Sequence, residues 1–229
     1  MNAESLPEPS SQQTEQHRNN RSLIERKSKM SNTSKKALIV VDVQNDFVEG
    51  GALAVNGGKT VAVKIADLLN SRDTMSQYSQ IVLTRDWHID PGSHFSDEPD
   101  YVTTWPVHCV AGSAGAEFVD CIKNIRWDRD VTIVNKGMYE DAYSGFQGIT
   151  LSGTPLAEHL RENSITSVDV VGIATDYCVK ETALDAAREG FTTTVILDLC
   201  AGISQETINR TVETEFPEAE VRTTQSTNL

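Results

Sequence analysis

The segment ALIVVD (residues 37–42) decides the fold class of this 229-residue chain. Its five apolar residues run without a polar interruption and end at Asp42, which is typical of a parallel strand covered on both faces. Helical spacing or turn residues separate this run from similar ones further along the chain. The similar runs are QIVLT (80–84), VTIVN (131–135), SVDVVGI (167–173) and TTTVILD (192–198).

The segments between these runs predict helices. Helical spacing covers residues 59–72 and 178–189, and Thr154-Pro155 supplies a cap and a first-turn proline for another helix. A last helix is expected to begin near Ser204. Strands that alternate with helices predict an α/β fold, in which a doubly wound, mostly parallel sheet carries helices on both faces.

The N-terminal residues differ in composition from the rest of the chain. They are rich in Ser, Gln, Asn, Glu and Pro, which predicts a flexible polar leader over residues 1–35 and one domain over residues 36–229. The polar residues after Phe216 are expected to fray. Because no run approaches the roughly 18 apolar residues of a membrane span and no secretory signal is visible, we expect a cytoplasmic protein, with nuclear access left open.

The chain is strongly acidic, with a formal net charge of −13 at pH 7. Such a surface repels phosphate backbones, so we expect a small-molecule substrate and no nucleic-acid or membrane partner. The predicted scaffold is compatible with a homo-oligomer, either a dimer or a tetramer. The four cysteines have irregular spacings, which favours free thiols over a disulfide framework.

Polar residues follow the apolar runs at the edge where doubly wound sheets bind ligands. Asp42, Asp86 and Lys136 follow three of the runs, and Cys178 lies just beyond a fourth. A thiol at a helix start is favoured as thiolate by the helix dipole, and free N–H groups there can bind an oxyanion. Asp42 can accept the thiol proton, and Lys136 can lower the thiol pKa. Taken singly, an inert core cysteine, a turn aspartate and a surface lysine are the ordinary alternatives.

A second cluster combines one aspartate with three histidines. Asp86 and His88 leave a strand on the same side, and the Pro91-Gly92 turn can bring His94 back towards them. One carboxylate with imidazoles suits zinc, iron or manganese better than calcium or magnesium. The alternative is a set of loop histidines that only make hydrogen bonds. The cluster lies in RDWHIDPGSH (85–94) and WPVHC (105–109), the latter with His108.

Aromatic residues near these groups predict a flat slot for a substrate. They are Phe47, Trp87, Trp105 and Tyr143, each of which would alone be more often a core residue. Asp46, four residues after Asp42, either supports a metal ligand or caps a turn.

Five blocks together carry a resemblance to a known family. In this order they resemble the nicotinamidase (pyrazinamidase/nicotinamidase) family of the isochorismatase-like cysteine hydrolases, over roughly residues 36–200. The leader lies outside the resemblance. The blocks are ALIVVDVQNDFVEGGALAV (37–55), TRDWHIDPGSHFS (84–96), WPVHCVAGSAGAEF (105–118), KGMYEDAYSGF (136–146) and GIATDYCVKETALDA (172–186).

The resemblance implies hydrolysis of nicotinamide to nicotinate and ammonia through a cysteine thioester, as a step of NAD salvage. It assigns Cys178 as nucleophile, Asp42 as general base and Lys136 as third member of the triad. It also implies a cis peptide bond between Ile173 and Ala174, with the N–H groups of Ala174 and Cys178 forming the oxyanion hole.

The resemblance further implies a metal site and an aromatic slot. Phe47 and Trp105 are similar to the aromatic walls of the family, and with Tyr143 and Ala174 they are the residues expected to bind the substrate. The expected ion is zinc, with iron or manganese as alternatives. Its implied ligands are Asp86, His88, His94 and, as the ligand that varies within the family, His108.

Other functions stay open at this stage. A related amidase on the same scaffold would act on carbamoyl or ureido amides without a metal, and the histidine cluster argues against it. An isochorismatase proper would lack the nucleophilic Cys178. A catalytically silent binding module or a redox-sensing thiol protein belongs to a different functional class. Measuring ammonia release from nicotinamide distinguishes this class from an amidase.

Overall fold

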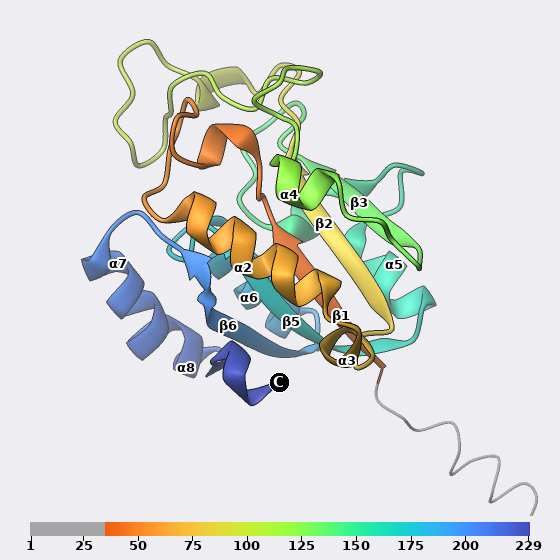
Figure 1. The fold of residues 1–229 in the computed structure, drawn as a ribbon. Coiled ribbons are helices and arrows are strands. Elements are labelled where there is room, and N and C mark those ends of the chain that lie inside the picture. The colour runs from red at the N-terminus through yellow and green to blue at the C-terminus, as the bar shows by residue number, and fades with distance from the viewer. Residues whose placement is uncertain (1–34) are drawn as a thin grey trace, which may run out of the picture. The chain divides into compact units, whose positions relative to one another are not determined.

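The computed structural model describes residues 35–229, which form a seven-stranded sheet in the order β4-β3-β2-β1-β5-β6-β7 (Figure 1). Only the edge strand β4 runs antiparallel to its neighbour, so the predicted mostly parallel α/β fold is confirmed. Apart from Lys35, the predicted leader lies outside the described residues. The strands are β1 Lys35–Val41, β2 Gln80–Asp86, β3 Val131–Lys136, β4 Ile149–Thr150, β5 Ile165–Ile173, β6 Thr192–Ala201 and β7 Arg222–Thr224.

The opening segment of the sequence occupies the centre of the sheet. β1 pairs in parallel with β2 on one side and with β5 on the other, and its residues 37–41 are no more than 1% exposed. A strand buried on both faces needs apolar residues at every position, which is why ALIVV shows no alternation.

Helices cover both faces of the sheet and bury two separate apolar clusters. α2 (Gly58–Asn70) packs one cluster with α4 (Asp120–Lys123), while α5 (Leu156–Glu162) and α6 (Cys178–Arg188) pack the other. No helix within residues 35–229 combines the length and the hydropathy that a membrane crossing requires. The remaining helices are α3 Arg72–Met75, α7 Gln205–Arg210 and α8 Phe216–Glu218, with a π-helical turn at Thr211–Glu215 and 3₁₀ turns at Asn45–Phe47, Gly92–His94, Gly145–Gln147 and Ser226–Asn228.

The C-terminal segment is ordered, so the expectation that it frays after Phe216 is wrong. Phe216 is fully buried, and β7 adds a parallel edge strand to β6. Asp198 in β6 then accepts hydrogen bonds from the Ser226 N–H at 2.7 Å and the Ser226 hydroxyl at 2.5 Å. A three-residue strand of Arg and Thr carries no hydrophobic pattern, so its sequence gives no sign of it.

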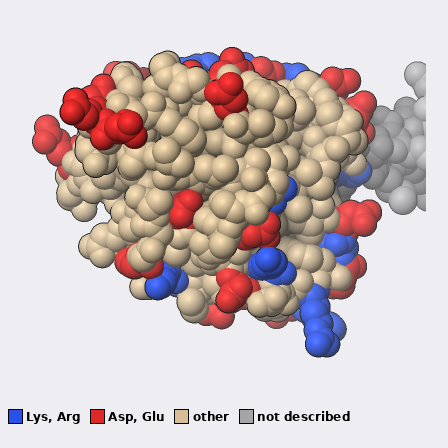
Figure 2. All heavy atoms as spheres, turned by 90° about the horizontal axis from the view of Figure 1, so that it is seen from above, with Lys and Arg blue, Asp and Glu red and all other residues tan. Residues whose placement is uncertain are grey.

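The carboxyl ends of the strands meet at one edge of the sheet, at the top of Figure 1. Asp42 directly follows β1, Asp86 ends β2 and Lys136 ends β3, while Cys178 begins α6 after β5. The long connections after β1 and β2 lie above this edge. Figure 2 looks onto the same face and shows few charged side chains across its centre.

Candidate active site

Lys136 is the centre of a buried charge cluster. Its side chain is completely buried, with Nζ 3.0 Å from Asp42 Oδ2 and in contact with Asp86 Oδ1. The ammonium also donates hydrogen bonds to the Ala142 carbonyl oxygen at 2.9 Å and to Cys178 Sγ at 3.6 Å. The structure therefore brings together the four polar residues that the sequence places at strand ends.

Asp42 is held by the backbone and by a neighbouring strand. It adopts the left-handed conformation, with φ +51°, in which a short polar side chain is tolerated. Its N–H donates to the Thr84 carbonyl oxygen at 3.2 Å, and the Thr84 hydroxyl donates to Oδ1 at 2.7 Å. Its other carboxylate oxygen, Oδ2, has no hydrogen-bond donor in good geometry among residues 35–229. A lone pair is thus available to accept a proton.

Gln44 fixes the ends of β1 and β2 relative to each other, a role that the sequence did not indicate. Its amide nitrogen donates to the carbonyl oxygens of Asp86 at 2.8 Å and Ala116 at 2.9 Å. Its amide oxygen accepts a hydrogen bond from the Asp86 N–H at 2.8 Å. Because Gln44 is fully buried, these bonds hold the two catalytic strand ends in one register.

Burial and mutual charge shift the pKa values of Asp42, Asp86 and Lys136 in different directions. Burial raises the pKa of Asp42, with Asp86 adding to the effect and Lys136 opposing it. Burial also opposes ionisation of Asp86, but the Lys136 ammonium, with the neighbouring imidazoles of His108 and His88, holds the pKa of Asp86 well below its ordinary value. The pKa of Lys136 lies well above its ordinary value because both carboxylates outweigh its burial. Asp42 is therefore the more basic carboxylate of the pair.

The surroundings of Cys178 favour the thiol over the thiolate, although its position at a helix start favours the thiolate. Burial raises the pKa of its thiol well above the ordinary value, and Asp42 and Asp86 raise it further, while Lys136 opposes them only in part. The helix dipole and Lys136, which favour the thiolate, are thus outweighed by burial and by the two carboxylates. A base is therefore needed to form the thiolate, and Asp42, whose own pKa is raised, is suited to accept the proton.

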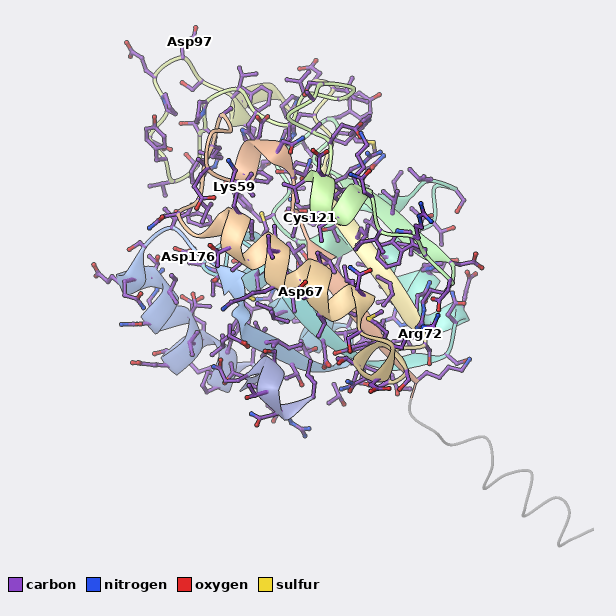
Figure 3. The ribbon with its side chains drawn as sticks, viewed as in Figure 1. Lys59, Asp67, Arg72, Asp97, Cys121 and Asp176 are labelled. Atoms are coloured by element: carbon purple, nitrogen blue, oxygen red, sulfur yellow. The ribbon has the colours of Figure 1, made fainter. Side chains whose placement is uncertain are left out.

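The loop between β5 and Cys178 contains a cis peptide bond and a buried aspartate that hydrogen-bonds to a second loop. The peptide bond between Ile173 and Ala174 is cis, as the resemblance implied, and Ala174 lies at the cavity described below. Cys178 is the first residue of α6, so its N–H has no partner within the helix. Figure 3 labels Asp176, whose carboxylate accepts hydrogen bonds from the N–H groups of Ile203 at 2.9 Å and Ser204 at 3.0 Å.

Three histidines form a compact cluster beside the charged residues. His88, His94 and His108 are buried and offer ligand atoms that lie within 4.8 Å of one another. Nδ1 of His88 lies 2.6 Å from the Gly137 carbonyl oxygen, and Nδ1 of His108 lies 2.7 Å from the Pro106 carbonyl oxygen. A proton on each Nδ1 leaves the Nε2 lone pairs free, which is the arrangement of metal-binding histidines.

The donor atoms of this cluster fit a divalent metal ion. Within residues 35–229, His88 Nε2 and His94 Nδ1 are buried without a hydrogen-bond partner, which is costly unless a ligand satisfies them. Asp86 Oδ2 lies 3.6 Å from His88 Nε2 and 3.8 Å from His108 Nε2. Burial and the neighbouring imidazoles lower the pKa of His94 to about 4, so its ring is neutral at pH 7, as metal binding requires.

A largely apolar cavity opens between the two clusters. Phe47, Trp105, Tyr143 and Ala174 all line it, and the Trp105 indole N–H donates to the Tyr143 hydroxyl at 2.9 Å. Its lining combines aromatic rings with a few polar groups, which is typical of a site for a small molecule. Trp87 does not line it, because its ring stacks on the Arg85 guanidinium, 3.8 Å from the ring centre.

Several lining residues were not predicted from the sequence. Leu53, Val55 and Ile203 carry no chemical signal of a site and reach the cavity only through the path of their loops. Tyr177 also lines the cavity and packs edge-on against Trp105, with ring centres 5.3 Å apart. Its position next to Cys178 in GIATDYCVK was the one signal that could have identified it.

Comparisons with known proteins agree with this geometry. A model of the isochorismatase domain matches residues 36–226. The chain is 50% identical over 172 residues to the nicotinamidase/pyrazinamidase of Mycobacterium tuberculosis, which covers 75% of this chain and 89% of that protein. It is 38% identical to the solved pyrazinamidase of Pyrococcus horikoshii in complex with zinc, with a TM-score of 0.69 over 83% of this chain and 99% of that chain. The yeast nicotinamidase bound to the inhibitor nicotinaldehyde is 32% identical, with a TM-score of 0.70 over 83% of this chain and 100% of that chain.

Proposed function

Because this chain belongs to the isochorismatase domain family, we propose that it hydrolyses nicotinamide to nicotinate and ammonia. The observation that carries this proposal is the convergence of Cys178, Asp42 and Lys136 at an apolar cavity next to three buried histidines. The similar nicotinamidases support the choice of substrate. The cavity is lined by aromatic rings and by polar groups of both clusters, a combination that suits a pyridine ring with its carboxamide.

The first half of the reaction forms a thioester. With the ring between Phe47 and Trp105, Asp42 takes the thiol proton of Cys178, and the sulfur forms a bond to the carboxamide carbon. The carbonyl electron pair moves to oxygen, where the N–H groups of Ala174 and Cys178 can stabilise the negative charge. The C–N bond then breaks, and Asp42 returns its proton to the departing nitrogen, which leaves as ammonia.

The second half releases the acid. Asp42, again ionised, takes a proton from water as the water oxygen attacks the thioester carbon. The C–S bond breaks, the product leaves as nicotinate after its carboxyl group releases a proton to solvent, and the proton held by Asp42 returns to the sulfur of Cys178. Lys136 stays protonated throughout, since its pKa lies well above its ordinary value under the influence of Asp42 and Asp86. Its ammonium therefore compensates the negative charge that moves between Asp42 and Cys178.

The proposed metal site consists of Asp86, His88, His94 and His108. When bound, the ion would supply a Lewis acid that orients the heterocyclic nitrogen of the substrate. We propose zinc, because a set of imidazoles with one carboxylate suits it and because a similar pyrazinamidase is described in complex with zinc. Iron and manganese also accept this donor set.

The test is release of ammonia from nicotinamide by the purified protein. Turnover of nicotinamide, with none of a carbamoyl or ureido amide, is the expected result. The opposite preference would assign the chain to the related metal-free amidases. Failure of every amide to react would leave a binding module or a thiol sensor. Cys178→Ala is the matched control for contaminating amidases.

A further inference from the structure

Asp46 lies near the metal site without belonging to the cavity. One carboxylate oxygen, Oδ2, accepts a hydrogen bond from the Cys109 N–H at 2.7 Å, and Oδ1 accepts one from the Ala52 N–H at 3.3 Å. Cys109 directly follows His108. Because Asp46 is not among the residues that line the cavity, it does not reach a substrate there.

The Cys109 peptide links the backbones of two histidines. Cys109 adopts the left-handed conformation, with φ +46°, which is uncommon for a residue other than glycine and needs support from its surroundings. Its carbonyl oxygen accepts a hydrogen bond from the His88 N–H at 3.0 Å. The His88 carbonyl oxygen in turn accepts one from the Ala111 N–H at 2.8 Å. The orientation of this one residue therefore sets both His88 and His108.

The space around the Asp46 carboxylate is shaped for it. The Asp46 N–H donates to the Gly115 carbonyl oxygen at 3.1 Å, and the Asp46 carbonyl oxygen accepts from the Leu53 N–H at 2.9 Å. A Cβ atom added to Gly115 would overlap the carboxylate itself. Asp46 thus connects three chain segments, of which one carries His108 and another carries the cavity residue Leu53.

We propose that Asp46 is a positioning residue of the metal site, whose carboxylate fixes the Cys109 peptide and through it the relative placement of His88 and His108. The inference rests on the proposed metal site and adds a residue that does not itself bind the ion. Its action is on the geometry of the ligands, so its loss weakens metal binding before it affects the chemistry.

The test measures the affinity for Zn²⁺ by competition with a chromophoric chelator. We expect Asp46→Ala to weaken Zn²⁺ binding by about 10- to 100-fold, as is usual for residues that orient metal ligands. Asp46→Asn keeps one acceptor oxygen for the Cys109 N–H and is expected to restore most of the affinity. Gly115→Ala, which displaces the carboxylate without changing its chemistry, is expected to weaken binding as Asp46→Ala does.

Two further measurements separate positioning from general stability. The absorption spectrum of the Co²⁺-substituted protein is expected to change in Asp46→Ala, and activity lost at limiting Zn²⁺ is expected to return when Zn²⁺ is raised. Asp198→Ala is the matched control, because it also removes a carboxylate that accepts backbone and hydroxyl hydrogen bonds, here from Ser226. Its Zn²⁺ affinity is expected to equal that of the wild type.

Wild-type Zn²⁺ affinity and Co²⁺ spectrum in folded Asp46→Ala would overturn the inference. If Asp46→Ala does not fold, the same result in Gly115→Ala would overturn it. A wild-type protein that binds no Zn²⁺ would instead remove the proposed metal site, and the inference with it. Ammonia release by that metal-free wild type would then show whether the proposed hydrolysis survives.

Discussion

The two ends of β1 each carry a lysine–aspartate pair, and the two pairs have different properties. At the amino end, Lys36 Nζ lies 3.0 Å from Asp169 Oδ2, and the Tyr78 hydroxyl donates to the same oxygen at 2.7 Å. The Lys36 side chain is 32% exposed. At the carboxyl end, Lys136 is completely buried and is shared by Asp42 and Asp86.

The difference between these pairs lies in charge balance. The amino-end cluster has one cation for one anion, and neither Lys36 nor Asp169 lines the cavity. The carboxyl-end cluster has two carboxylates for one ammonium, which lies 3.0 Å from Asp42 Oδ2 and also contacts Asp86. A buried cluster that carries more negative than positive charge can take up a proton or a cation. The comparison thus contrasts an ion pair suited to stabilising the fold with one suited to the proposed chemistry.

The largest effect on catalysis is expected from replacing the aspartate of the carboxyl-end pair, Asp42, in comparison with that of the amino-end pair, Asp169. Asp42→Asn removes the base and is expected to lower kcat by about 10²- to 10⁴-fold, the usual contribution of general acid–base catalysis. Asp169→Asn is expected to leave kcat unchanged per folded molecule and to lower the free energy of unfolding instead. Ammonia assays and urea denaturation of both variants check this. Equal losses of kcat would erase the distinction between the two ends.

Exchanging the lysines tests the same contrast through stability. Lys136→Met leaves two buried carboxylates without their cation, and we expect a loss of about 3–5 kcal/mol in the free energy of unfolding. Lys36→Met breaks a partly exposed pair, for which about 1 kcal/mol or less is expected. Urea denaturation of the metal-free proteins measures both. A Lys136→Met variant as stable as Lys36→Met would show that the buried cluster does not depend on its ammonium.

Removing the metal is expected to lower the activity of the cluster at the carboxyl end of β1 and to leave the Lys36–Asp169 pair at the amino end unchanged. Exhaustive chelation should lower the rate of ammonia release by roughly 100-fold or more, because a bound ion contributes several kcal/mol to such reactions. Zn²⁺ should restore the rate. Urea denaturation at each Zn²⁺ level gives the parallel readout, since the bound ion stabilises the folded state. Full activity after chelation, with the metal content verified by elemental analysis, would leave the three histidines without the proposed role.

The smallest effect is expected from Tyr78→Phe, which changes how the free energy of unfolding depends on pH in the alkaline range. Burial, together with Asp169, raises the pKa of the Tyr78 hydroxyl above its ordinary value. The folded state therefore holds this proton more tightly than the unfolded state, so its contribution is complete below about pH 10 and is lost as the pH rises beyond that. Tyr78→Phe is expected to cost about 1 kcal/mol at neutral pH and to flatten the alkaline decline in stability. Thermal unfolding at a series of alkaline pH values measures this decline in both proteins. A decline in Tyr78→Phe as steep as in the wild type would contradict the prediction.

Much of the fold was predictable because its central strands are buried on both faces. β1, β2 and β5 show continuous apolar runs, and these runs located the sheet. The edge strands β4 and β7 have two and three residues, too few to establish any periodicity. Their presence depends on pairing with β3 and β6, which a local pattern does not encode.

The candidate site was predictable where chemistry coincides with a strand end. Asp42, Asp86 and Lys136 stand at such ends, so their convergence follows from the parallel topology. The pKa of Cys178 was not predictable, because it depends on burial and on two carboxylates whose distance only the folded chain sets. The contribution of Ile203 to the cavity was also not predictable from the sequence, because the position of its loop depends on a hydrogen bond from the Ile203 N–H to the carboxylate of Asp176.

The most direct test of the central claim is to trap the covalent intermediate. Wild-type protein mixed with nicotinamide and quenched in acid within the first turnovers should gain the mass of one nicotinoyl group, located by peptide mapping on Cys178. Cys178→Ala should gain none and release no ammonia above background. Ammonia released by Cys178→Ala at the wild-type rate, with no acylated peptide in either protein, would contradict the account.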